Sequence, residues 1–304
     1  MTATAAEREK WRGIFPAVPT AFRDDGQVDE EGYRAILEDN IRHGVHGFWN
    51  AGGTGEGAIM NDAQRVAVAR VTGEVCQGRV LSILHVGSPT TESSVKAARA
   101  ARESGCDAIC CVPPVIYIGN ERSIIEHYQR VADAADLPFF AYNLPQMTQV
   151  ELTPPLMEKI QRAVPQLVGM KHSAFNFANL GIFAAMGLRV FTGNGFLLLP
   201  ALENGGIGVV DAPPSVAPWI YVELFEAWQR DDLDIARARQ DETRAITELT
   251  RSNGTPHHNT KIIIGARLGR DLGAPLPPVN RLDAAGRQAL LAEAGKLGLL
   301  EART

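Results

Sequence analysis

The most restrictive feature of this 304-residue chain is a regular alternation of short apolar runs with longer stretches of helical periodicity. This alternation is typical of repeated βα units, in which a helix joins each strand to the next parallel strand. Eight apolar runs predict strands at Gly13–Phe22, Gly47–Ala51, Arg79–Val86, Ala108–Val112, Pro138–Asn143, Leu167–Lys171, Arg189–Thr192 and Gly206–Val210. We expect helices at about Asp29–His43, Asp62–Cys76, Thr90–Ser104, Ser123–Ala135, after Thr153-Pro154, at Phe175–Met186 and from Pro214 towards Gln229.

Eight βα units within about 225 residues predict a (β/α)₈ TIM barrel, a fold that typically takes about 250 residues. Residues 1–230 are the expected catalytic barrel. Residues 231–304 show helical periodicity without a strand pattern, so we expect a C-terminal helical segment packed on the barrel. The alternative is a doubly wound sheet. That fold normally carries a glycine-rich phosphate fingerprint after its first strand, where this chain has Pro16 and Pro19.

Composition excludes several classes of partner. A net charge of -5 argues against non-specific binding to nucleic acid or to an anionic membrane. The first twelve residues lack the apolar stretch of a secretory signal, and no apolar run approaches the roughly 20 residues of a membrane span. The cysteines form no CxxC motif and have no histidine at metal-ligand spacing. We therefore expect no metal site and a cytoplasmic protein with reduced core cysteines at Cys76, Cys106, Cys110 and Cys111.

Lys171 closes the apolar run that begins at Leu167, and it is the only one of the six lysines in such a position. A lysine is rarely buried without a partner, because removing water from an ammonium is costly. Burial favours the neutral amine, which is a nucleophile towards carbonyl groups. The alternative is a structural lysine whose charged end reaches solvent beyond the strand.

In a barrel, the carboxyl ends of all strands share one rim, and the chemistry of such folds takes place there. The loop Gly52-Gly53-Thr54-Gly55-Glu56 follows the second predicted strand, and its converging N–H groups suit a carboxylate or a phosphate. It lacks the GK[ST] ending of a P-loop, and a tight βα turn explains it as well. Tyr142 ends the fifth strand, where a phenol can transfer protons beside an iminium. A half-buried structural tyrosine is the alternative there. Together with Lys171, these elements predict chemistry on a 2-oxo acid.

At this point the chain resembles the dihydrodipicolinate synthase / N-acetylneuraminate lyase family of class I (Schiff-base) aldolases, from about Gly13 to Pro278. The matching motifs are Pro19-Thr20-Ala21-Phe22 with Asp25-Gly26 and Val28-Asp29, Gly47 followed by the glycine-rich loop, Tyr142-Asn143-Leu144-Pro145, Val168-Gly169-Met170-Lys171 and Gly193-Asn194. The resemblance implies a (β/α)₈ barrel with a C-terminal helical segment, a homotetramer, and no metal or organic cofactor. It also implies that Lys171 is the Schiff-base lysine, that Tyr142 transfers protons, and that Gly53 and Thr54 cradle the substrate carboxylate.

Three departures from the family pattern concern the synthase reaction. Gly53 stands where the family usually has a hydroxyl residue. Met147 occupies the position at which the synthases have an arginine for the second substrate's carboxylate, and Ile116 stands where a tyrosine is expected to reach the neighbouring subunit's site. Dihydrodipicolinate synthesis is therefore the less favoured activity.

Other positions point towards the lyase branch with an altered pocket. His85-Val86-Gly87 is similar to that branch, but Asn194-Gly195-Phe196 replaces the acidic residues that bind the sugar tail in sialic-acid lyases. Trp49, Met147 and Phe196 suggest a less polar outer pocket, and hence a shorter or more apolar aldehyde. The expected substrate-binding residues are Gly53, Thr54, His85, Met147, Gly193, Asn194 and Asp211.

We predict a lyase that forms a Schiff base between Lys171 and a 2-oxo acid. In the favoured reaction, a 4-hydroxy-2-oxo acid is cleaved to pyruvate and an aldehyde, or is formed from them. A dehydratase that removes water from a 2-oxo-3-deoxy sugar acid on the same iminium is the closest alternative. A non-catalytic 2-oxo acid binder is a further alternative from a different class.

Overall fold

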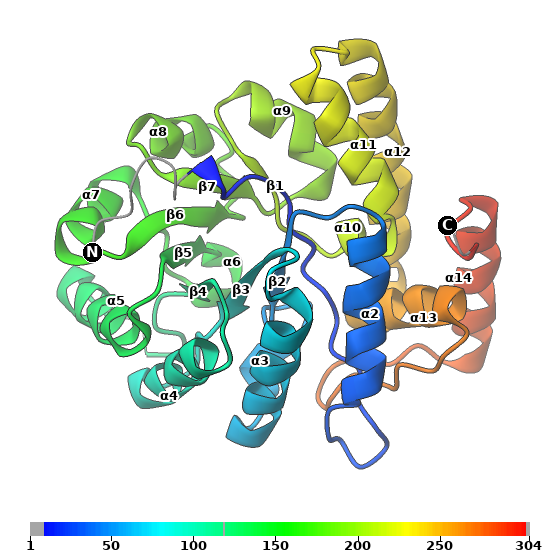
Figure 1. The fold of residues 1–304 in the computed structure, drawn as a ribbon, viewed down its shortest axis with the longest axis horizontal. Helices are drawn as coiled ribbons and strands as arrows, with labels where there is room; N and C mark the ends of the chain where they lie inside the picture. The colour runs from blue at the N-terminus through cyan, green and yellow to red at the C-terminus, as the bar shows by residue number, and fades with distance from the viewer. Residues whose placement is uncertain (1–8, 118, 302–304) are drawn as a thin grey trace.

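Eight parallel strands form a barrel in the order β1-β8-β7-β6-β5-β4-β3-β2 (Figure 1). This computed structural model describes residues 9–117 and 119–301, so the ends of the two expected ranges, 1–230 and 231–304, lie outside it. Two hydrogen bonds close the gap between β2 and β1. The N–H of His46 donates to the Ile14 carbonyl over 3.0 Å, and the N–H of Trp49 donates to the Pro16 carbonyl over 3.0 Å. The strands are β1 Gly13–Ile14, β2 Gly47–Asn50, β3 Leu81–His85, β4 Ala108–Cys111, β5 Phe139–Asn143, β6 Leu167–His172, β7 Arg189–Thr192 and β8 Gly208–Val209.

Helices cover the outside of the barrel, and their chain order confirms the predicted βα alternation. They are α2 Glu30–Arg42, α3 Asp62–Cys76, α4 Thr91–Glu103, α5 Glu121–Ala135, α6 Pro145–Thr148, α7 Pro154–Ala163, α8 Asn179–Ala185, α9 Leu198–Glu203, α10 Pro213–Val216, α11 Pro218–Gln229, α12 Leu233–Arg251, α13 Pro256–Leu268 and α14 Ala284–Lys296. Short 3₁₀ turns lie at η1 Gly57–Ile59, η2 Gly195–Leu197 and η3 Ser252–Gly254.

Several predicted boundaries are wrong, and proline accounts for two of them. The regular first strand ends at Ile14 rather than Phe22, because Pro16 and Pro19 have no N–H for an uninterrupted ladder. Single bonds from the N–H groups of Phe15 and Ala17 to Val209 and Asp211 continue the pairing for a short distance. The helix expected from Pro214 to Gln229 is broken at Ala217 (φ -133°, ψ 60°), since a residue before proline is driven out of helical geometry.

Short helices explain the other differences. The helix expected at Phe175–Met186 spans only Asn179–Ala185. The prediction missed α6 and α9, which have four and six residues, because so short a segment shows no helical periodicity.

Aromatic rings fill the barrel interior. Trp49 lies 5.9 Å from Phe140, and Phe15 lies 4.8 Å from Phe191, measured between ring centroids. Side chains alternate between the two faces of each strand, so one set packs inside the barrel and the other against the helices. The centre of the barrel is therefore a packed core, and it forms a floor beneath the rim at the strands' carboxyl ends.

The C-terminal helices pack on one side of the barrel, and Figure 1 shows α13 beside α2 and α12 beside α11. Arg267 of α13 lies buried and donates to the Asp39 carboxylate of α2 over 3.1 and 2.7 Å. The same guanidinium donates to the carbonyl oxygens of Val216 and Leu299. We propose from these contacts that the described part of the C-terminal segment, residues 231–301, folds together with the barrel. Within the described residues, no helix combines the length and apolar character that a bilayer crossing needs.

Replacing Arg267 tests this packing. We expect Arg267→Met to lower the free energy of unfolding by about 3 kcal/mol, because it leaves the buried Asp39 carboxylate without its main partner. Arg230→Met is the matched control. Its exposed pair with Glu226 should contribute at most about 1 kcal/mol. Urea unfolding of both variants measures the difference, and equal losses would show that Arg267 does not anchor the segment.

Candidate active site

Lys171 and Tyr142 are the centre of the candidate site. They stand opposite each other in the parallel register of β6 and β5, and each is only 6% exposed. The Lys171 Nζ lies 4.5 Å from the centroid of the Tyr142 ring and 5.9 Å from that of Trp49. The ion pairs among the described residues do not include Lys171. The amine is therefore set among aromatic rings, with no carboxylate of a described residue within ion-pair distance.

His85 completes this group at the end of β3. Its ring meets the Tyr142 ring edge to face, with centroids 6.0 Å apart. Neither ring nitrogen makes a well-formed hydrogen bond within the described part of the chain. Burial lowers the pKa of His85 to about 3, with further lowering by electrostatic interactions with Arg65 and Lys171. The imidazole is therefore neutral near pH 7 and offers one donor and one acceptor to a ligand.

The glycine-rich loop after β2 is tightly folded. The N–H of Glu56 donates to the Gly53 carbonyl over 3.0 Å, and the N–H of Gly57 donates to Gly52. A Cβ at Gly57 would lie 1.8 Å from the Ala51 carbonyl oxygen, so only glycine fits there. Gly53 is exposed, with open space where a side chain would stand, and Thr54 is half-buried. Because Trp49 of β2 reaches Lys171, this loop begins across the barrel mouth from the amine.

Gly193 and Asn194 follow β7 on the same rim. A Cβ at Gly193 would lie 1.8 Å from the Ser173 hydroxyl, so this glycine lets the loops after β6 and β7 pack together. Asn194 is half-buried, and its N–H donates to the Thr192 hydroxyl. A substrate-binding role for either residue stays a prediction.

Asp211 and Met147 are less directly placed for substrate. The Asp211 carboxylate accepts the N–H of Gly195 over 2.9 Å and pairs with Arg251 over 3.1 Å, so it holds the loop after β7 against α12. Met147 lies on α6 with 74% of its surface exposed. Ile116, in the loop after β4, is 76% exposed and has a left-handed backbone with φ 70°. We keep the substrate-binding roles of Asp211 and Met147 as predictions.

Contacts from the C-terminal segment to this rim could not be predicted from the sequence. His257 of α13 lies 3.1 Å from the Gly53 carbonyl, and Lys261 of α13 pairs with Glu56 over 2.6 Å. No local pattern marks these residues, because each lies more than two hundred positions from its partner. The structure also shows His172 on the outer side of β6, where its ring contacts Asn143 and Asn176, so it has a packing role.

Comparisons with known proteins agree with this geometry. A sequence profile of the dihydrodipicolinate synthetase family matches residues 10–294. A 4-hydroxy-tetrahydrodipicolinate synthase of Nitratidesulfovibrio vulgaris is 29% identical over 94% of this chain and 99% of its own. A probable 2-dehydro-3-deoxy-D-pentonate aldolase of Escherichia coli is 32% identical over 75% of this chain and 78% of its own. The E. coli prophage protein YagE, solved with pyruvate, superposes with a TM-score of 0.89 at 27% identity, covering 95% of this chain and 99% of its own.

The neutral state of His85 predicts a pH dependence of stability. The folded His85 stays neutral down to about pH 3, whereas in the unfolded chain it binds a proton below about pH 6.5. Its contribution to stability is therefore present above pH 6.5 and is lost as the pH falls towards 3. At pH 5 we expect the free energy of unfolding to be lower by roughly 2 kcal/mol for this reason. A His85→Asn variant lacks the imidazole and should not show this decrease. Urea unfolding at pH 7 and pH 5 measures the difference. An equal loss in both proteins would contradict the buried neutral state.

Proposed function

Because this chain belongs to the dihydrodipicolinate synthetase family and is a lyase of it, we propose that it works as a pyruvate-type aldolase through a Schiff base on Lys171. In the proposed reaction, a 4-hydroxy-2-oxo acid is cleaved to pyruvate and an aldehyde, or the two are condensed. The observation that carries the proposal is the placement of Lys171. It is a buried lysine without an ion pair to a described residue, and its amine lies over the ring of a tyrosine on the adjacent strand.

The proposed steps assign one task to each group. The Lys171 amine attacks the ketone carbon, water leaves, and the resulting iminium draws electrons from the neighbouring carbon. Tyr142 takes the proton from the 4-hydroxyl. The bond between carbons 3 and 4 then breaks, and its electron pair forms the enamine as the aldehyde departs. A proton returned to the enamine carbon and hydrolysis of the iminium release pyruvate. The N–H groups around Gly53 and Thr54 hold the substrate carboxylate throughout.

The substrate class follows from the outer pocket and from the relatives. With the exposed Met147 in place of an arginine, the rim has no cation at the position that serves the synthases' second substrate. The pentonate aldolase relative is named for a 2-dehydro-3-deoxy sugar acid, which carries a hydroxyl at carbon 4, where a retro-aldol cleavage needs it. We therefore favour a short 4-hydroxy-2-oxo acid over a long polyol.

We also propose that the enzyme is a cytoplasmic homotetramer. Large apolar side chains remain exposed on consecutive rim loops, as expected of surfaces that a second copy covers. They are Ile116, Tyr117, Met147 and Phe175. All four cysteines are free and buried, in keeping with a reducing compartment.

Trapping the intermediate tests the role of Lys171. Incubation with pyruvate followed by borohydride should add the mass of a reduced pyruvyl group to the peptide that contains Lys171, because reduction makes the carbon–nitrogen bond permanent. Lys171→Ala should give no adduct, whereas Lys159→Ala, which changes an exposed lysine, should be labelled like the wild type. A wild-type protein that gives no adduct would falsify the Schiff-base mechanism. A panel of 2-oxo acids, assayed for pyruvate against dehydrated product, then separates aldolase from dehydratase.

Removing the hydroxyl of Tyr142 tests its part in proton transfer. We expect Tyr142→Phe to lower kcat by about 10²-fold or more, since general acid–base groups typically contribute that much. The ring and its contact with Trp49 remain, so the fold and the trapped adduct should persist. Tyr128→Phe, which removes a buried hydroxyl on α5, serves as the control. Full activity of Tyr142→Phe would assign proton transfer to another group.

A further inference from the structure

One face of α13 contacts the glycine-rich loop at both ends. In the first turn of α13, the His257 Nε2 lies 3.1 Å from the Gly53 carbonyl oxygen and donates to it in the tautomer protonated there. One helical turn later, the Lys261 Nζ lies 2.6 Å from the Glu56 carboxylate. Residues four apart share one face of a helix. The C-terminal segment therefore touches the loop on either side of Thr54.

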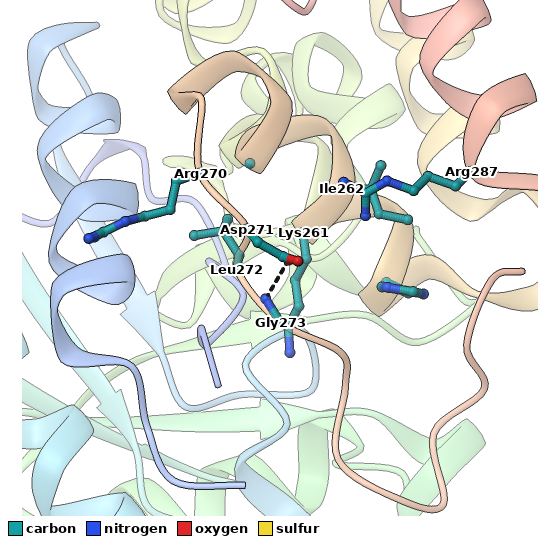
Figure 2. A pocket seen from close by; sticks show the side chains of 9 residues that line it. Lys261, Ile262, Arg270, Asp271, Leu272, Gly273 and Arg287 are labelled. Carbon is teal, nitrogen blue, oxygen red and sulfur yellow. Dashed lines mark hydrogen bonds between the residues drawn. The ribbon is translucent and has the colours of Figure 1, made fainter. Parts of the chain in front are cut away.

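The pair between Lys261 and Glu56 is withdrawn from solvent, with side chains 1% and 0% exposed. The second carboxylate oxygen of Glu56 accepts the N–H of Leu276 over 2.6 Å. Lys261 also lies 4.4 Å from the centroid of the Phe22 ring. Figure 2 shows the Lys261 side chain leaving α13 and running past Gly273, in a direction different from those of Arg270 and Arg287. A buried ion pair contributes little net stability compared with apolar residues of similar size. Its presence here points to a role in placing the loop.

The loop has a conformation that needs outside support. Ala51 and Glu56, one at each end, have left-handed backbones with φ 53° and 62°. Residues other than glycine rarely adopt this conformation, and it persists where the surroundings fix it. On the barrel side, the Thr20 hydroxyl donates to the Gly55 carbonyl over 2.9 Å. On the other side, the contacts of α13 fix Glu56 and Gly53.

We propose that Glu56, His257 and Lys261 are positioning residues, which hold the N–H groups around Gly53 and Thr54 where they meet the carboxylate of the 2-oxo acid. The inference rests on the proposed function, because it takes this loop to be the carboxylate cradle. The C-terminal segment thereby becomes part of the active site without touching the substrate. Its contribution is to the binding of the 2-oxo acid, while the reactivity of Lys171 is set within the barrel.

Two variants and one control test this proposal. Both variants change the clamp, the name we give to Glu56, His257 and Lys261. The double variant Glu56→Gln/Lys261→Met removes both charges, so no buried charge is left unpaired, and the amide oxygen still accepts the N–H of Leu276. His257→Ala removes the other contact without touching a buried charge. Lys296→Met changes an exposed lysine of α14 and is the control.

Two measurements are made on each protein. Hydrogen exchange of the amides from Gly52 to Gly57 reports the order of the loop without substrate. The pyruvate concentration for half-maximal borohydride trapping on Lys171 reports carboxylate binding. In the double variant, we expect faster loop exchange and about a tenfold higher half-saturating concentration, the effect of weakening a hydrogen bond to a charged group. His257→Ala should shift both in the same direction. The labelling at saturating pyruvate and the exchange of β5 and β6 should match the wild type.

The outcomes separate the clamp from the proposed function. Unchanged loop exchange and unchanged half-saturation in both variants would overturn the clamp while leaving the Schiff base intact. If the wild type gives no adduct, the proposed function fails, and loop exchange alone decides whether α13 orders the loop. If the double variant does not fold, His257→Ala decides, because its contact is at the surface. A uniform loss of labelling at saturating pyruvate would assign these residues to general stability and count against the proposal.

Discussion

The structure depends on the parallel register between β5 and β6, which places Tyr142 directly beside Lys171. In a parallel pair the side chains of partnered residues point to the same face, so both groups enter the barrel together. A shift of this register by one residue would turn either side chain into the helix layer. The barrel resists such a shift because each strand is paired on both sides. Closure between β1 and β2 therefore helps to fix the register of β5 and β6, although those strands lie on a different part of the barrel.

The aromatic interior supports the same arrangement from below. Trp49 packs against Phe140 and Tyr142, so Lys171 and Tyr142 stand on a floor of rings whose rotamers are fixed by packing. The neighbours of the amine on this side are aromatic rings. His85 adds a neutral imidazole beside Tyr142, and its depressed pKa follows from the same burial. The inner side of the site is thus a packed apolar core.

The fold class and the positions of Tyr142 and Lys171 near strand ends could be predicted from the sequence, because both depend on local signals. The bounds of α3 were predicted to the residue, and the run from Leu167 to Lys171 stops one residue short of the end of β6. The catalytic roles of the two side chains stay predictions. The first strand was overextended because its apolar pattern continues to Phe22, whereas the regular strand covers only Gly13–Ile14 and the last bond to the β8 side is that of the Ala17 N–H. A substrate-binding role for Asp211 stays a prediction, and the contacts of its carboxylate with Arg251 and the N–H of Gly195 could be found only in the fold. Contacts of this kind join distant segments, so no window of sequence contains them.

The glycine-rich loop shows why distant contacts matter for function. A loop built from glycines is free to approach a carboxylate closely, but the same freedom disorders it in isolation. The barrel fixes where this loop begins, at Ala51, and the Thr20 hydroxyl fixes one of its carbonyls. The remaining freedom lies around Glu56, whose left-handed backbone is not favoured by its own residue type. The buried Lys261 of α13 pairs with Glu56 and restricts this part of the loop. A helix appended after the eighth unit is therefore well suited to supply the rigidity that the rim loop lacks.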